Sequence, residues 1–174
     1  MIIPRFCAAG ICVVAGLAML GAVGCVTEGT PPRPAPRPIG AQPSGIVPSV
    51  VDLAATRYAR DSDKNGFADE VATTAFLFAP PHNTPLTIAG TFRFTMVKLN
   101  GTPYATWDFD AAKSAAAVEK LLPGPGYRFQ LSLLEHGTDE FPSEDMQLRC
   151  MFTPTGGDPV QSRSPIRVTV GRLR

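Results

Sequence analysis

The stretch Thr87–Phe109, T-I-A-G-T-F-R-F-T-M-V-K-L-N-G-T-P-Y-A-T-W-D-F, decides the fold. Apolar and polar side chains alternate along its first half, as expected for a strand with one buried face. Asn100-Gly101 then predicts a type I′ turn, because both residues accept a positive φ. The second half alternates again, so the whole stretch predicts a β-hairpin. Its core-facing residues are Ile88, Phe92, Phe94, Met96, Trp107 and Phe109.

Similar strand patterns flank this hairpin on both sides. Residues 49–59 fit a strand or a helix, and the strands that follow favour a strand. About seven strands separated by turn residues are expected in all. Besides the hairpin they cover residues 49–59, 70–79, 127–133, 146–153, 160–162 and 166–170.

One helix is expected, over residues 110–122, with Asp110 as its N-cap and Pro123–Gly126 as its end. A short helix between strands suits a connection from one sheet to another. The sequence therefore predicts a mainly β protein, an antiparallel two-sheet β-sandwich of immunoglobulin-like type with one short connecting helix. Closed barrels and two-sheet folds of the C2 or transthyretin kind fit the same pattern.

The chain has 174 residues and a net charge of +1, which allows one folded domain after an N-terminal leader. Acidic and basic residues are mixed along the sequence, so no basic face for nucleic acid is expected. The expected organisation is a lipoprotein signal peptide at 1–24, a lipidated cysteine with a Pro-rich tether at 25–48, and a β-sandwich domain at 49–174.

The N-terminus has the pattern of a secretory signal: Arg5, then an apolar run that ends in small residues. A transmembrane helix is the alternative. Leu20-Gly21-Ala22-Val23-Gly24-Cys25 resembles the lipobox of bacterial lipoproteins, with Ala22 where leucine is commonest. The resemblance implies lipidation of Cys25 and an extracytoplasmic protein held on a bacterial membrane by acyl chains. Val26 at the next position favours the outer membrane.

The segment Val26–Pro48 is rich in proline and predicts a polyproline-II tether that could span roughly 70 Å. A ligand for a proline-binding groove is the alternative. The tether is expected to hold the domain away from the membrane.

The segment Arg60–Glu70, R-D-S-D-K-N-G-F-A-D-E, is the candidate metal site. Its spacing resembles the calcium loops of EF-hands and thrombospondin type 3 repeats, which implies oxygen ligands at alternate positions around a tight glycine turn. Ala72 replaces the bidentate glutamate of an EF-hand, so only a weaker calcium loop is expected. A metal-free turn rich in Asx side chains is the alternative. The candidate ligands are Asp61, Asp63, Asn65, Asp69 and the Phe67 carbonyl.

Other chemical groups carry no catalytic motif. Cys150 lies in phase with apolar strand residues and is expected to be a buried hydrophobe. His82 and His136 are expected in loops, without partners for catalysis or metal binding. A second acidic cluster is expected to be a solvated loop; it comprises Asp139, Glu140, Glu144 and Asp145.

The sequence thus predicts a non-enzymatic, membrane-anchored lipoprotein whose domain binds a protein or glycan or has a structural role. The layout resembles uncharacterised bacterial secreted lipoproteins with one small β domain. A carbohydrate- or protein-recognition module with a structural calcium is the second hypothesis, and a hydrolase the third. Exposure of Tyr58, Tyr104 and Phe141 would favour the second.

Overall fold

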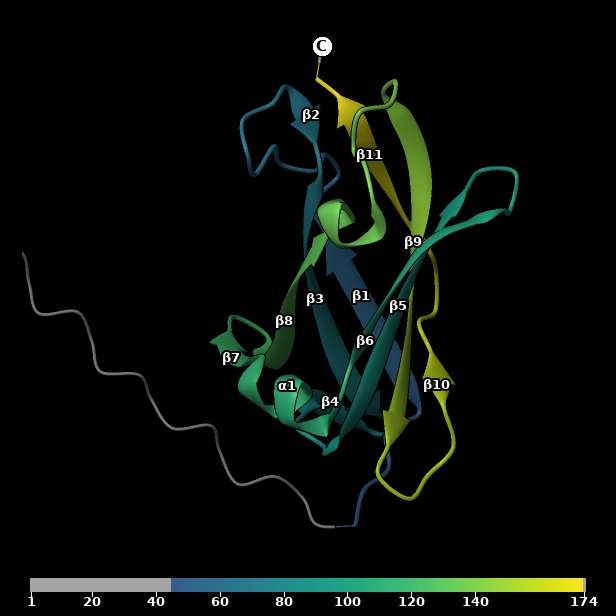
Figure 1. Ribbon diagram of the computed structural model, residues 1–174. Helices are drawn as coiled ribbons and strands as arrows, with labels where there is room; N and C mark the ends of the chain where they lie inside the picture. The colour runs from purple at the N-terminus through teal and green to yellow at the C-terminus, as the bar shows by residue number, and fades with distance from the viewer. Residues whose placement is uncertain (1–44, 174) are drawn as a thin grey trace, which may run out of the picture. The chain divides into compact units, whose positions relative to one another are not determined.

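The computed structural model describes residues 45–173. The signal peptide, Cys25, the tether up to residue 44 and Arg174 lie outside the described residues. The described part is a mainly β sandwich of two antiparallel sheets, which confirms the predicted fold class (Figure 1). Its elements are β1 (Val50–Ala55), β2 (Phe67–Ala68), β3 (Glu70–Ala79), β4 (His82–Leu86), β5 (Gly90–Lys98), β6 (Pro103–Phe109), α1 (Ala111–Ala116), β7 (Val118–Leu121), β8 (Gly124–Ser132), the 3₁₀ helix η1 (Leu133–His136), β9 (Glu144–Pro154), β10 (Val160–Gln161) and β11 (Ile166–Arg172).

One sheet has the order β1-β3-β8-β7, with β4 paired to β3. The other has the order β2-β11-β9-β5-β6, with β10 paired to β9. The chain passes from the first sheet to the second directly after β1: Thr169 N donates to Arg57 O at 2.7 Å, and Ala59 N donates to Thr169 O at 2.9 Å. These bonds form a parallel bridge to β11, so segment 57–59 links the two sheets at one edge.

The core is aromatic and lies between the sheets. The Phe92 ring lies 4.7 Å from Tyr127, 5.2 Å from Phe129 and 4.7 Å from Phe152, measured between centroids. Such pairs each contribute about 0.5–1.5 kcal/mol beyond area burial. The predicted core phase is confirmed, because Phe92, Phe94, Met96 and Trp107 are buried.

The hairpin 87–109 is confirmed as β5 and β6, but its turn differs from the prediction. Gly101 has φ +88°, whereas Asn100 keeps a negative φ, so the type I′ prediction is wrong. Gly101 N donates to Lys98 O at 2.8 Å, and the register shifts between Met96 and Val97. A type I turn followed by a glycine bulge needs only one residue with positive φ.

The predicted helix is only half present. Asp110 caps it as expected, because its Oδ1 accepts Lys113 N at 2.8 Å. α1 also joins the two sheets as expected, since it leads from β6 to β7. The helix ends at Ala116, however, and residues 118–121 form β7. Backbone pairing of β7 with β8 outweighs the helix propensity of this short segment.

Candidate metal-binding loop

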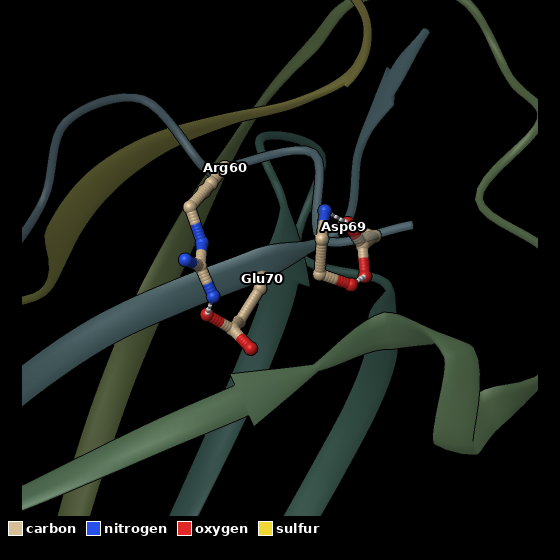
Figure 2. Close-up of polar contacts among 4 residues, drawn as sticks. Arg60, Asp69 and Glu70 are labelled. Carbon is tan, nitrogen blue, oxygen red and sulfur yellow. Dashed lines mark hydrogen bonds and ion pairs between the residues drawn. The ribbon is translucent and has the colours of Figure 1, made fainter. Parts of the chain in front are cut away.

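The Asp-rich loop, residues 61–69, is closed at its base by Arg60 and Glu70. Arg60 O accepts the N–H groups of Asp69 and Glu70, both at 2.9 Å, and Arg60 N donates to Glu70 O at 2.8 Å. Figure 2 shows the side chains of the same pair meeting, with Arg60 Nη2 at 2.6 Å from Glu70 Oε1. The loop therefore leaves and re-enters the sandwich at one fixed point.

The loop lies at the end of the sandwich opposite Gly45. The β1–β3 ladder runs from the Val50–Phe78 pair to the Ala55–Thr73 pair, and the loop continues from the second end. Figure 1 shows the chain entering at one end, with β2 and the end of β11 at the other. The loop is thus close to the tether in sequence but separated from residues 45–49 by the length of β1.

Asp61 organises the first half of the loop. Its Oδ1 accepts Lys64 N at 2.6 Å and Asn65 N at 3.2 Å, and its Oδ2 accepts Gly66 N at 2.8 Å. Lys64 and Gly66 have φ values of +65° and +91°. Partial desolvation raises the pKa of Asp61, but the three N–H groups outweigh it and hold that pKa below its ordinary value. Asp61 is therefore a fixed carboxylate.

Asp69 lies at the end of the loop, is fully buried and holds the start of the loop through Ser62. Its two carboxylate oxygens accept Ser62 N and Ser62 Oγ, each at 2.6 Å. Figure 2 shows Asp69 beside the Arg60–Glu70 pair, where the loop rejoins β3. A buried carboxylate is thereby directed into the loop.

Asp61, Asp63 and Asp69 converge, with one ligand atom of each within 4.8 Å of the others. Desolvation raises the pKa of Asp63, the Asn65 N–H lowers it, and the Asp61 and Asp139 carboxylates raise it further. The net shift of this pKa is upward, with desolvation as its largest cause and repulsion by the neighbouring carboxylates as a smaller one. This cluster could hold a metal ion.

Asp139 is the residue that sequence reasoning missed. It was predicted to be solvated, but it is buried, and its Oδ2 and Oδ1 accept Asn65 Nδ2 at 3.1 and 3.3 Å. The solvated-loop prediction is therefore wrong for Asp139, and it is also wrong for Glu144 and Asp145, which are half-buried in β9. No local sequence signal links Asp139 to Asn65, because the two residues lie 74 positions apart.

The remaining predicted ligands are Asn65 and the Phe67 carbonyl. Asn65 Oδ1 accepts Phe67 N at 2.8 Å, and Phe67 begins β2. A ligand role for the Phe67 carbonyl stays a prediction. Ala72, at the twelfth position, has no side-chain oxygen and pairs with Gln130 inside the sheet.

The other reactive side chains are engaged elsewhere. Cys150 is buried as predicted, and burial raises the pKa of its thiol, which keeps it protonated. His136 packs edge-on against Trp107 with the ring centroids 5.0 Å apart. His82 lies in β4, an edge strand, and the loop prediction is wrong there.

The three aromatic residues singled out from the sequence behave differently. Tyr58 is 68% exposed, whereas Tyr104 and Phe141 are half-buried with ring centroids 5.6 Å apart. Of these three residues, only Tyr58 is exposed.

Comparison with protein-family models, curated proteins and solved structures gives no match to this chain. Within residues 45–173, no helix is both long and apolar enough to cross a membrane.

Proposed function

We propose that this protein is an extracytoplasmic lipoprotein, anchored to a bacterial membrane through Cys25, whose β-sandwich acts as a non-enzymatic binding or structural domain. The lipobox-like sequence before Cys25 supports the anchor. The protonated, buried Cys150 and the packed His136 support a non-enzymatic role, because neither is positioned as a nucleophile or a base.

The loop is proposed to bind calcium. The observation that carries this proposal is the convergence of three carboxylates, from Asp61, Asp63 and Asp69, within 4.8 Å. Calcium takes six to eight oxygen ligands in flexible geometry, whereas magnesium demands a small octahedral cage. A loop that supplies oxygens from alternate residues of one segment suits the larger ion, which does not require an octahedral cage.

Isothermal titration of the full-length protein with Ca²⁺ tests the metal. Binding is expected in the wild type and is expected to weaken by about tenfold or more in Asp63→Ala, which removes one charged ligand. Asp158→Ala is the matched control, because Asp158 is exposed in another turn. Absence of heat in the wild type, or equal heat in Asp63→Ala, would rule out calcium in this loop.

Metabolic labelling with an alkyne fatty acid tests the anchor. The wild-type protein is expected to be labelled and to partition into membranes, whereas Cys25→Ser is expected to lose both properties. Labelling that persists in Cys25→Ser contradicts the proposed anchor. A protein that stays in the membrane without label supports the transmembrane alternative.

A recognition module with a structural calcium is the second candidate. The observation that favours it is the 68% exposure of Tyr58, on the segment that links the two sheets. Large aromatic side chains are enriched in recognition surfaces because they offer an apolar face with a polar tip.

A further inference from the structure

A cavity of about 520 Å³ opens beside the Asp-rich loop, at the end of β11. Its volume falls within the roughly 300–1,000 Å³ typical of small-ligand sites. Ala68, which follows Phe67 in β2, forms part of its wall, so the cavity and the loop share a strand. Its polar lining consists of Arg57, Tyr58, Ser143, Asp145, Thr169 and Arg172.

Two arginines in this lining have guanidinium groups that form no ion pair or hydrogen bond with the part of the chain that the structure describes. Within residues 45–173, the Arg57 side chain has only a ring contact, 6.0 Å from the Tyr58 centroid, and that of Arg172 has no partner. The other arginines of this part of the chain are engaged by Glu70, Asp108, Glu119, Asp52, Asp145 or the amide of Gln147. Guanidinium groups bind carboxylates through two parallel hydrogen bonds. The cavity therefore holds two free carboxylate-binding groups.

The backbone places Arg57 and Arg172 close enough for one ligand to contact both side chains. Arg57 O accepts Thr169 N at 2.7 Å, and Arg172 follows three positions later on the same strand. Three strand residues span about 10 Å, which two long side chains can bridge. A single ligand in the cavity can therefore contact both guanidinium groups.

Asp145 narrows the class of ligand. Its Oδ1 accepts Thr169 Oγ1 at 2.6 Å, and its Oδ2 lies 3.8 Å from Arg167 Nη1, so this carboxylate retains acceptor capacity inside the lining. A simple inorganic anion would be repelled by Asp145. A ligand with hydroxyl groups next to its carboxylate would donate to Asp145 instead.

We propose that this cavity binds an acidic saccharide of the uronic-acid type. Arg57 and Arg172 bind the sugar carboxylate, Asp145 accepts a sugar hydroxyl, and the exposed face of Tyr58 covers the sugar ring. This assignment deepens the recognition function proposed above, and its contacts do not require the loop metal.

Titration of the full-length protein with trigalacturonic acid tests the assignment, with the neutral galactose trisaccharide of the same linkage as the matched probe. The acidic sugar is expected to bind and the neutral one to bind at least about tenfold more weakly. Arg57→Gln and Arg172→Gln are each expected to weaken binding by about tenfold. Arg128→Gln is the control, because Arg128 pairs with Glu119 outside the cavity.

Equal binding of the two sugars, no binding of either, or unchanged binding in both cavity variants would overturn the inference. Tri-glutamate or sulfate binding as tightly as the acidic sugar would overturn the saccharide assignment. If a variant does not fold, the wild-type amide resonances of Thr169 and Gly171 decide: they are expected to shift with trigalacturonic acid, and unmoved resonances overturn it. Parallel titrations with Ca²⁺ separate the two proposals, because lost sugar binding with retained calcium heat defeats only this one.

Discussion

Residues 45–173 contain two Asn-Gly turns that have the same local hydrogen bond but different surroundings. Asn65 Oδ1 accepts Phe67 N at 2.8 Å, and Asn100 Oδ1 accepts Thr102 N at 3.0 Å. The following glycines have nearly the same φ, +91° and +88°. The Asn100-Gly101 turn closes a hairpin with the Asn100–Thr102 bond and two backbone bonds of Lys98, to Gly101 and Thr102.

The Asn65-Gly66 turn is surrounded by carboxylates that an Asn-Gly turn does not require. Asp61, Asp63 and Asp69 gather around it, and buried Asp139 reaches it from a distant loop. Carboxylates held close together repel one another unless a cation lies between them. The difference between two otherwise similar turns therefore marks the loop as a candidate ion site.

The largest expected effect comes from Asp69→Ala. The substitution removes two short hydrogen bonds to Ser62 and leaves those groups without their buried acceptor. A loss of about 3 kcal/mol in the free energy of unfolding is expected, because bonds to a charged acceptor contribute the most. Urea unfolding of the full-length protein measures it. Asp158→Ala should change stability by less than about 0.5 kcal/mol; a similar loss in both variants would contradict the role given to Asp69.

The two asparagines should differ although their local bonds match. Asn65→Ala also strips the hydrogen bonds from buried Asp139, so a cost of about 2 kcal/mol is expected. Asn100→Ala loses a single exposed bond, at about 0.5–1 kcal/mol. Equal costs in chemical unfolding would mean that the Asn65–Asp139 contact contributes nothing.

The Asn65–Asp139 contact also shows where sequence reasoning stops. Alternation along β5, β8 and β9 predicted the strands and their buried faces, because period two is a local property. The three converging aspartates also lie within nine consecutive residues. Asp139 joins them only through the tertiary fold, and an acidic segment between strands is normally solvated.

The errors in the fold have a related cause. Residues 118–121 carry a helix-compatible sequence but pair with β8, and their outcome depended on a partner strand rather than on propensity. The lining of the cavity at the end of β11 was not predictable either, because Arg57, Asp145 and Arg172 come from separate segments. The sequence marks Tyr58 as a candidate exposed aromatic and Asp145 as a member of an acidic cluster, but nothing in it links these two residues to the arginines.

The two glycines allow a matched test of smaller size. A Cβ at Gly66 or Gly101 meets nothing within 4 Å, so alanine introduces backbone strain alone. Each substitution should cost about 1–2 kcal/mol in a chelating buffer. Only Gly66→Ala should also weaken Ca²⁺ binding in calorimetry. Equal Ca²⁺ affinity in the two variants would show that the geometry of the loop does not set its affinity.

The smallest but most discriminating effect is expected from Asp63→Asn. The raised pKa of Asp63 reflects desolvation and two carboxylate neighbours, so removing its charge relieves repulsion while keeping an oxygen. Calorimetry should therefore give a slightly higher Tm than wild type in a chelator and a lower Tm than wild type in Ca²⁺, where a charged ligand is missing. Asn100→Asp, which adds a charge to the plain turn, should shift Tm in one direction in both buffers. If Asp63→Asn also shifts Tm in one direction in both buffers, the two Asn-Gly turns are physically equivalent, and the extra carboxylates of the loop have a role other than holding an ion.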